Sequence, residues 1–170
     1  MVTNTMRCPS INDLPLPPPG KIGWPWTEGT SKKTDLLDNY NTLPRVSIIT
    51  PSFNQGKFIE ETIRSVLLQN YPDIEYLIID GGSTDETVGV IKKYEQWISF
   101  WVSEKDNGQA HAINKGLRRS TGEIAMYLNS DDILLPNAIT CAVQQFLSTP
   151  TTGLVFGKLQ LINAKSETLR

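Results

Sequence analysis

The sequence predicts an α/β fold in which helices alternate with the strands of a mostly parallel sheet. From Arg45 onward, short aliphatic runs of strand length alternate with segments whose apolar residues recur at helical spacing. This alternation is typical of βα units, in which a helix returns the chain to the same end of the sheet. At 170 residues the chain has room for one such domain and a tail, since domains usually contain about 100–200 residues. We place the domain at residues 45–170 and an arm at residues 1–44.

The arm is set apart by its prolines. Proline has no backbone N–H and a fixed φ, so this segment cannot join a regular helix or a central strand. The favoured interpretation is a poorly ordered, polyproline-like leader. In the alternative interpretation, Trp24 and Trp26 pin the arm to the surface of the domain. The prolines concerned are Pro9, Pro15, Pro17, Pro18, Pro19 and Pro25.

Five strands and four helices are expected after the arm. The strands are Val46–Thr50, Glu75–Asp80, Ile98–Val102, Glu123–Leu128 and Leu154–Leu161. The clearest helix follows the first strand, starts at Phe58 and ends near Asn70, because its apolar residues fall on one face. The other helices are Thr84–Tyr94, Gly108–Arg119 and Pro136–Leu147. We expect Pro136 in the first turn of its helix, where the missing N–H breaks no hydrogen bond.

Composition excludes several classes of function. Sixteen Lys and Arg residues against 18 Asp and Glu residues give a net charge of -2, so a broad electrostatic grip on nucleic acid is not expected. No apolar stretch approaches the ~20 residues of a transmembrane helix. The first ten residues lack the pattern of a secretory signal, so we expect a cytoplasmic chain. The two cysteines, Cys8 and Cys141, suggest neither a disulfide framework nor a zinc site.

Polar residues follow three of the expected strands. The carboxyl ends of parallel strands meet at one edge of a sheet, and ligands bind in the crevice beyond that edge. Hydroxyls, amides and carboxylates gathered there predict a site for a hydrogen-bonding, metal-chelated, anionic ligand. The three segments are Thr50-Pro51-Ser52-Phe53-Asn54, Asp80-Gly81-Gly82-Ser83-Thr84-Asp85 and Asn129-Ser130-Asp131-Asp132.

The adjacent carboxylates Asp131 and Asp132 have two interpretations. Because they repel each other, they need solvent or a cation to remain ionised together. Hard oxygen ligands suit Mg²⁺ or Mn²⁺, whose coordination is usually completed by phosphate oxygens and water, so a diphosphate ligand follows. Alternatively, one of the two caps the helix that begins near Pro136, since Asp is a favoured capping residue.

The segment from Asp80 to Glu86 also admits two interpretations. Ser83 and Glu86 fit a capping box, which would start the helix here. Asp80, however, precedes that box at a strand end, where its carboxylate could accept hydrogen bonds from a nucleobase imide or a ribose hydroxyl. The basic residues Lys115, Arg118 and Arg119 are interpreted as solvated surface or, alternatively, as a phosphate clamp. His111, the only histidine, is read as a structural hydrogen-bonding group.

Together these segments resemble family 2 glycosyltransferases, inverting enzymes of the GT-A fold that use nucleotide-activated sugars. The resemblance covers residues 45–160 and rests on four motifs in order. They are Val46-Ser47-Ile48-Ile49-Thr50-Pro51-Ser52-Phe53-Asn54, Ile78-Ile79-Asp80-Gly81-Gly82-Ser83-Thr84-Asp85, Asn107-Gly108-Gln109-Ala110 through Asn114-Lys115-Gly116, and Tyr127-Leu128-Asn129-Ser130-Asp131-Asp132. The implied fold is the Rossmann-like, three-layer α/β/α GT-A fold, truncated at its C-terminal side.

The resemblance also implies roles for individual residues. Thr50, Pro51 and Ser52 would line the nucleotide pocket, Asp80 would contact the base, usually uracil, and Asp131 would bind Mn²⁺ or Mg²⁺. The family's Asp-x-Asp motif starts here with Asn129, whose amide can bond ribose but is a weak metal ligand. Ser130 belongs to the same nucleotide-sugar site, Asp132 would support the loop or share the metal, and Lys115 or Arg119 would approach the phosphates. The general base is expected beyond Arg170.

The resemblance leaves several functional interpretations open. The chain is expected to be either a transferase for a UDP-sugar or a catalytically incomplete nucleotide-binding or interaction module. A receiver domain would need an acidic pair after the first strand, and a sugar nucleotidyltransferase would need a glycine-rich basic loop there; residues 50–56 match neither. The family implies a glycan or lipid-linked acceptor, with association at the inner membrane face. The apolar residues between Leu154 and Ile162 predict an uncovered surface and self-association.

Overall fold

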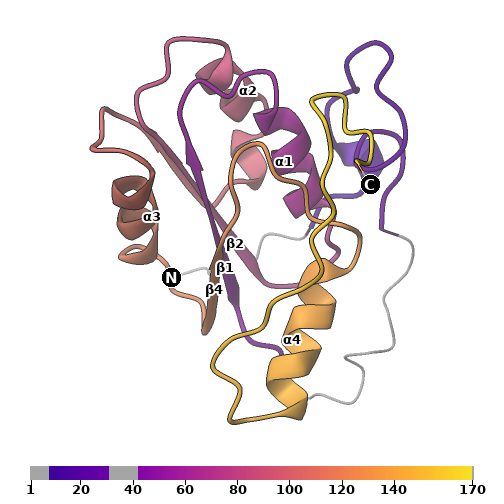
Figure 1. Cartoon of the computed structure of the whole chain (residues 1–170), viewed down its shortest axis with the longest axis vertical. Helices are drawn as coiled ribbons and strands as arrows, with labels where there is room; N and C mark the ends of the chain where they lie inside the picture. Colours follow the sequence, from indigo (N-terminus) through magenta and orange to yellow (C-terminus); the bar gives the residue numbers. More distant parts are fainter. Residues whose placement is uncertain (1–7, 31–41, 170) are drawn as a thin grey trace.

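A computed structural model describes residues 8–30 and 42–169. Its centre is a four-stranded, all-parallel sheet in the order β3-β2-β1-β4, with β1 paired to both β2 and β4 (Figure 1). The strands are β1 (Val46–Ser52), β2 (Ile74–Asp80), β3 (Phe100–Ser103) and β4 (Ile124–Tyr127). The register pairs Ser52 with Asp80 and Asp80 with Ser103, so these strands end together at one edge. The prediction of an α/β fold with a parallel sheet is confirmed.

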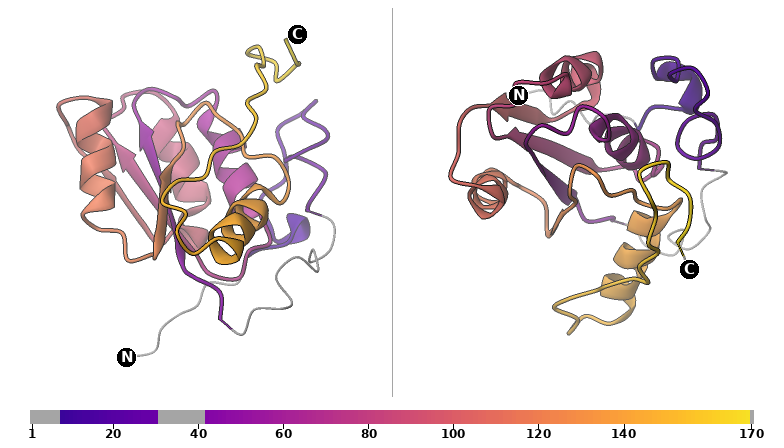
Figure 2. Two further views of the ribbon diagram at one scale, coloured as in Figure 1. Left: turned by 60° about the horizontal axis from the view of Figure 1, so that its bottom comes forward. Right: turned by 45° about the horizontal axis from the view of Figure 1, so that its top comes forward.

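Helices cover both faces of this sheet and give it three layers. Helix α3 lies alone on one face, whereas α1 and α2 lie together on the other (Figure 2). The helices are α1 (Ile59–Leu67), α2 (Thr87–Lys93), α3 (Gln109–Leu117) and α4 (Ala138–Ser148), with the short 3₁₀ turns η1 (Ile11–Asp13) and η3 (Glu95–Trp97). Among the described residues, no helix combines the length and apolar character needed to cross a membrane.

The period-two alternation of strands divides the core into two parts. Ile48 of β1 and Ile78 of β2 point toward α1, α2 and α4 and belong to the larger cluster of buried side chains. Their neighbours Ile49 and Ile79 point the other way and pack with Ala112 of α3. Both central strands are therefore apolar on both faces, as buried parallel strands usually are.

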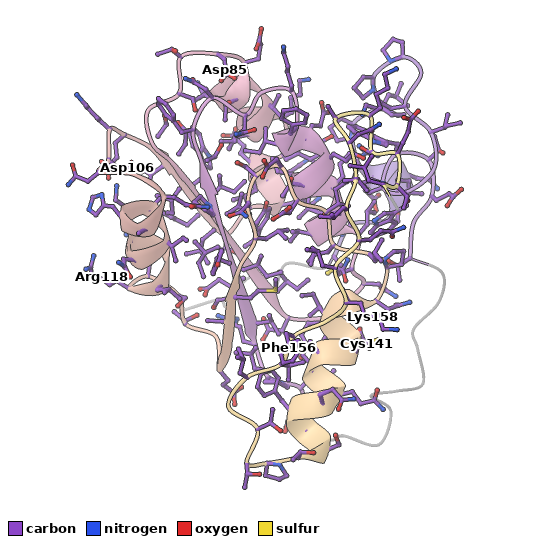
Figure 3. All side chains as sticks on the ribbon, viewed as in Figure 1. Asp85, Asp106, Arg118, Cys141, Phe156 and Lys158 are labelled. Atoms are coloured by element: carbon purple, nitrogen blue, oxygen red, sulfur yellow. The ribbon has the colours of Figure 1, made fainter. Side chains whose placement is uncertain are left out.

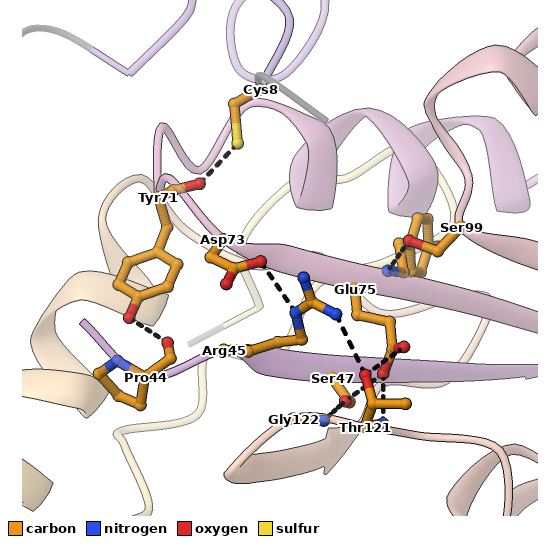
Figure 4. Close-up of polar contacts among 11 residues, drawn as sticks. Cys8, Pro44, Arg45, Ser47, Tyr71, Asp73, Glu75, Ser99, Thr121 and Gly122 are labelled. Carbon is orange, nitrogen blue, oxygen red and sulfur yellow. Dashed lines mark hydrogen bonds and ion pairs between the residues drawn. The ribbon is translucent and has the colours of Figure 1, made fainter. Parts of the chain in front are cut away.

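A polar network closes the edge of the sheet opposite the predicted site (Figure 4). The Glu75 carboxylate accepts hydrogen bonds from Ser47 Oγ at 2.5 Å and from the backbone and hydroxyl of Thr121 at 2.7 and 2.8 Å. Burial alone would raise the pKa of Glu75, but these donors outweigh burial and hold its pKa below the usual value. Arg45 pairs with Asp73 beside them at 3.0 Å. The network ties the starts of β1 and β2 to the turn before β4.

Residues 8–30, called the N-terminal segment below, pack against the domain. Arg64 of α1 is completely buried, and its guanidinium donates to the carbonyl oxygens of Pro15, Pro25 and Trp26 at 2.8–3.0 Å. Leu14 joins the larger core cluster, and the Trp26 ring is 4% exposed. The prediction of a poorly ordered leader is wrong for this segment. The alternative, attachment through the tryptophans, is correct there, while residues 1–7 and 31–41 lie outside the described residues.

The predicted fifth strand, Leu154–Leu161, is also wrong. In the structure this segment leaves α4 and lies beside no strand, so its backbone lacks a partner for a ladder. The only bridge recorded outside the described strands joins Ile162 to Thr168. Phe156 and Lys158 lie on this segment, and Figure 3 shows both near α4.

Two helices, α2 and α4, begin later in the structure than the predicted starts at Thr84 and Pro136. The Ser83 hydroxyl donates to Asp80 at 2.5 Å instead of capping a helix, so the capping box does not form. Helix α2 begins at Thr87, whose backbone N–H is accepted by Asp85 at 3.0 Å. Helix α4 begins at Ala138 after Asn137 in a left-handed conformation, which leaves Pro136 outside the first turn.

Candidate nucleotide-binding site

A cavity of about 530 Å³ opens at the carboxyl ends of the strands. All four strand ends contribute to it, and the start of α3 forms one side. Its lining runs from the β3 end across β2 and β1 to the β4 end, following the strand order of the sheet. The residues are Pro51, Ser52, Phe53, Gln55, Gly81, Lys105, Asp106, Gly108, Gln109, Ala112, Asn129, Ser130 and Asp131.

The end of β1 presents a buried hydroxyl to this cavity. Ser52 is 6% exposed, and its Oγ atom has no hydrogen-bond partner among the described residues. A buried hydroxyl normally has a partner, because leaving it unpaired costs about 1–3 kcal/mol. Thr50 lies on the same strand but outside the lining, and its hydroxyl is within 3.1 Å of the Tyr76 hydroxyl in the core. Ser52 thus lines the cavity with a hydroxyl that is unpaired among the described residues.

Asp80 at the end of β2 lies outside the lining and is fully buried. Its carboxylate accepts hydrogen bonds from the backbone N–H groups of Gly82 and Ser83 at 3.2 and 2.8 Å. The hydroxyls of Ser83 and Ser103 donate to it at 2.5 and 2.6 Å. With its oxygens engaged by the protein, Asp80 organises the loop behind the cavity, and its contact with the base stays a prediction.

Asp106 supplies the carboxylate at this end of the cavity instead. A Cβ atom placed on Gly81 would lie 3.1–3.2 Å from the Asp106 carboxyl group, so the absence of a side chain at Gly81 makes room for it. Asp106 Oδ1 accepts the Gly108 N–H at 2.8 Å, which fixes the turn into α3. Gly108 has φ +99°, a conformation that favours glycine. Figure 3 places Asp106 above α3, at the upper edge of the sheet.

The β4 end contributes the second carboxylate of the lining, Asp131. Asn129 is engaged on both sides: its Oδ1 accepts from Gln109 of α3 at 2.7 Å, and its Nδ2 donates to Asp132 at 2.9 Å. Asp132 lies outside the lining and is held by this bond. Asn129, Ser130 and Asp131 thus line one cavity with Pro51 and Ser52, as expected from the sequence, while Thr50, Asp80 and Lys115 lie outside its lining.

The basic residues expected near phosphate lie elsewhere. Lys115 Nζ bonds Glu104 at 2.7 Å, which holds the pKa of the Glu104 carboxyl below its usual value. The Arg119 guanidinium stacks on the Phe100 ring at 3.7 Å. The cation in the lining is Lys105, which sequence reasoning missed together with Asp106 and Gln109. Lys105 and Asp106 lie between the end of β3 and the start of α3, and Gln109 is the first residue of α3. The signal for all three was their place after a strand end, and Gln109 also stands in the third motif.

The donor set fits a cation that arrives with a phosphate ligand better than a resident metal. Among the described residues, no group of three or more His, Cys, Asp or Glu side chains could enclose a metal ion. The lining supplies one exposed carboxylate at the β4 end, Asp131, beside the amide of Asn129 and the hydroxyl of Ser130. Mg²⁺ in phosphate sites is typically held by one or two carboxylates and completed by phosphate oxygens and water.

Comparison with known proteins settles the family. The sequence pattern described as "Glycosyl transferase family 2" matches residues 47–167. The chain belongs to this family. An uncharacterized glycosyltransferase of Rickettsia conorii is 35% identical over 145 residues, which are 83% of this chain and 23% of that protein. The poly-beta-1,6-N-acetyl-D-glucosamine synthase of Staphylococcus epidermidis is 28% identical over 123 residues, 71% of this chain and 30% of the synthase.

Solved family structures agree with this fold. The mannosyltransferase PcManGT of Pyrobaculum calidifontis, solved with GDP-Man and Mn²⁺, is 31% identical with a TM-score of 0.60. The match covers 66% of this chain and 35% of PcManGT. TarS of S. aureus, residues 1–349 with UDP-GlcNAc, is 25% identical with a TM-score of 0.54, over 61% of this chain and 31% of that one. The chain therefore spans about a third of these structures and has the predicted GT-A fold.

Proposed function

We propose that the cavity binds the nucleoside diphosphate of a sugar nucleotide together with a divalent cation, and that this domain serves transfer of the sugar to an acceptor hydroxyl with inversion. The supporting observation is the buried, unpartnered hydroxyl of Ser52 in the wall of a cavity that ends at Asp131. Such a hydroxyl is stabilised when a polar ligand enters. Family membership favours a sugar nucleotide, and the resemblance favours uridine as the nucleoside.

The order of the strands suggests which end of the ligand lies at which end of the cavity. Asp131 lies at the β4 end of the cavity and Asp106 at the β3 end, with the β1 and β2 ends between them. If the diphosphate and cation occupy the Asp131 end, the base extends toward Gly81 and Asp106. A carboxylate accepts the imide N–H of uracil, so we assign base recognition to Asp106 in place of Asp80. The amide of Asn129 and the hydroxyl of Ser130 then lie near the ribose and diphosphate.

The chain's own residues position and orient the donor. Asp131, with Asn129 and Ser130 beside it, would hold the cation, which when bound neutralises charge on the departing diphosphate. Lys105 supplies positive charge to the lining from the side of α3. An acceptor hydroxyl on a glycan or lipid-linked glycan attacks the anomeric carbon opposite the diphosphate. The bond to the diphosphate breaks, and a base on the acceptor side takes the hydroxyl proton.

Calorimetric titration with UDP, with and without Mn²⁺, tests this proposal. UDP should bind the parent chain more tightly in Mn²⁺ than in EDTA. The ratio of UDP affinity in Mn²⁺ to UDP affinity in EDTA is called the gain from Mn²⁺. In Asp131→Asn this gain should fall by about tenfold or more, since even groups that only orient metal ligands typically contribute roughly 10–100-fold to metal affinity. CDP should bind more weakly than UDP, because cytosine has no imide N–H for Asp106.

Asp132→Asn is the matched control. It removes a carboxylate that is also exposed, on the neighbouring residue, but one that lies outside the lining and accepts from the Asn129 amide. It should keep most of the gain from Mn²⁺. Equal losses in both variants would refute a specific role for Asp131, and a folded parent chain that binds neither UDP nor GDP would refute the proposed function.

A further inference from the structure

The loop that follows Asp131 is held by side chains from outside the cavity. Four of its main-chain polar groups are bonded by side chains of α1, of Gln69 just after α1, and of the N-terminal segment. Thr62 Oγ1 donates to the Asp132 carbonyl at 2.8 Å, Ser65 Oγ accepts the Leu134 N–H at 3.1 Å, Gln69 Nε2 donates to the Leu135 carbonyl at 3.0 Å, and Trp24 Nε1 donates to the Leu134 carbonyl at 2.9 Å. Residues 131–135, which are Asp131 and the loop that follows it, are called the anchored loop below.

Helix α1 gives the anchored loop a rigid base. Thr62, Ser65 and Gln69 are all completely buried. Gln69 also accepts the Ile139 N–H at 3.2 Å and so fixes the first turn of α4, immediately after the loop. Buried side-chain amides and hydroxyls with fixed partners restrict the backbone they bind, because breaking any bond leaves an unpaired polar group.

Trp24 adds a contact from a distant part of the chain. It lies on the N-terminal segment, 110 residues from Leu134 in the sequence, and its ring packs against the larger core cluster. The segment itself is fixed to α1 by the three carbonyl oxygens that accept from Arg64. It also lies wholly before residues 47–167, which match the family pattern. A segment outside the family match therefore bonds directly to the loop carrying the proposed cation ligand.

We infer that Trp24 is a positioning residue for Asp131: by holding the Leu134 carbonyl it keeps the anchored loop in the conformation that binds a divalent cation and diphosphate. The cation and diphosphate part of this inference rests on the proposed function, whereas the positioning of the loop does not. Trp24 touches no ligand in this assignment and acts through Leu134. In this inference, the N-terminal segment contributes to the site by holding the anchored loop in place.

Two tryptophan variants separate this role from ordinary packing. Trp24→Phe removes an indole N–H that is bonded to the loop, whereas Trp26→Phe removes one that has no partner among the described residues. Trp26 is also the more deeply buried ring, 4% exposed, so its substitution should cost more thermal stability. If packing alone determined the conformation of the anchored loop, Trp26→Phe would disturb that loop more than Trp24→Phe does.

The first measurement is amide hydrogen exchange of the anchored loop without any ligand. In Trp24→Phe, exchange at the Leu134 N–H should be about two- to tenfold faster than in the parent, as expected for the net loss of one neutral hydrogen bond. Trp26→Phe should leave it nearly unchanged. Equal exchange at Leu134 in the two variants would overturn the inference.

The second measurement is UDP affinity in Mn²⁺ and in EDTA. Trp24→Phe should reduce the gain from Mn²⁺ by about two- to tenfold and leave UDP affinity in EDTA unchanged, because only the Asp131 end of the cavity is disturbed. An unchanged gain, or equal losses in both solutions, would overturn the link to Asp131. If the folded parent chain binds neither UDP nor GDP, the proposed function and this link fail, and hydrogen exchange still decides whether Trp24 positions the loop.

Discussion

At the scale of single residues, the site is distinguished by which buried polar groups are satisfied. Thr50 and Ser52 stand two positions apart on β1, and both are buried. The Thr50 hydroxyl shares a hydrogen bond with the Tyr76 hydroxyl, while the Ser52 hydroxyl has no partner in the described residues. Desolvation by burial raises the pKa of Tyr76, so its hydroxyl remains protonated at neutral pH. One hydroxyl serves the fold, and the other is available to a ligand.

This contrast predicts opposite effects of two similar substitutions. Ser52→Ala should leave the free energy of unfolding unchanged or raise it by about 1 kcal/mol, because an unsatisfied hydroxyl disappears. UDP affinity should fall by about threefold or more, since one hydrogen bond to the ligand is worth roughly 0.5–1.5 kcal/mol. Urea unfolding and calorimetric titration measure the two effects.

Thr50→Val is the matched control for Ser52→Ala. It leaves the buried Tyr76 hydroxyl unpaired and should lower the free energy of unfolding by about 1–3 kcal/mol. If Ser52→Ala destabilised the protein as much as Thr50→Val does, the Ser52 hydroxyl would have a structural partner, and its proposed role in binding would be wrong.

At the scale of elements, the position of α3 depends on one glycine. A Cβ atom on Gly116 would collide with the Ile49 side chain of β1. Helix α3 can therefore approach β1 closely only because Gly116 has no side chain. The same helix begins at Gln109, whose side chain crosses the cavity to Asn129, so the seating of α3 also determines the width of the site.

Two glycine-to-alanine variants test this seating. Gly116→Ala should lower the free energy of unfolding by about 1–3 kcal/mol, the usual cost of overpacking a core. Gly89→Ala lies in the exposed middle of α2 with open space around its Cβ position, and should raise it by roughly 0.4–1 kcal/mol. Chemical denaturation of both variants checks the prediction, and a stabilising effect of Gly116→Ala would contradict the close approach.

The elements also show how far the sequence predicts this structure. The four parallel strands and four helices follow from aliphatic runs and helical spacing, because burial on a sheet or helix face imposes those periods. The capping box failed because Ser83 bonds Asp80, a competition between local and tertiary contacts that spacing cannot resolve. The Leu154–Leu161 strand failed because an apolar run predicts burial but forms a strand only beside a partner.

For the site, the sequence correctly placed Pro51, Ser52, Asn129, Ser130 and Asp131 around one cavity. The motif at the end of β2 indicated a functional carboxylate, but a sequence does not give the direction of a side chain. Asp80 turns into its own loop, and the carboxylate at this end of the cavity comes from Asp106 on the next connection. The contact of Trp24 with Leu134 joins distant parts of the chain, and no local pattern encodes it.

At the scale of the whole molecule, the most conspicuous feature is an uncovered apolar segment after α4. Leu154, Phe156 and Leu159 are 78%, 88% and 84% exposed, and Leu161 is 58% exposed. Contiguous apolar surface of this kind is uncommon on monomeric soluble proteins and marks interaction or aggregation sites. The segment is the one predicted from the sequence as a fifth strand, and its apolar side chains are not buried among the described residues.

We therefore predict that the chain as given self-associates through this segment. Sedimentation velocity should show an average mass that rises with concentration. A variant with Leu154→Gln, Phe156→Gln and Leu159→Gln should sediment as a monomer of about 19 kDa and keep its circular dichroism spectrum. The driving force is the removal of apolar surface from water, which contributes about 25 cal/mol per Å².

A second variant, Leu16→Gln with Ile22→Gln, controls for general surface hydrophobicity. These two side chains are 91% and 80% exposed but lie on the N-terminal segment. The control should associate like the parent chain, because it leaves the segment after α4 intact. Monomeric sedimentation of the parent at all concentrations would show that this surface does not drive association. Equal suppression by both variants would indicate nonspecific attraction distributed over the whole molecule.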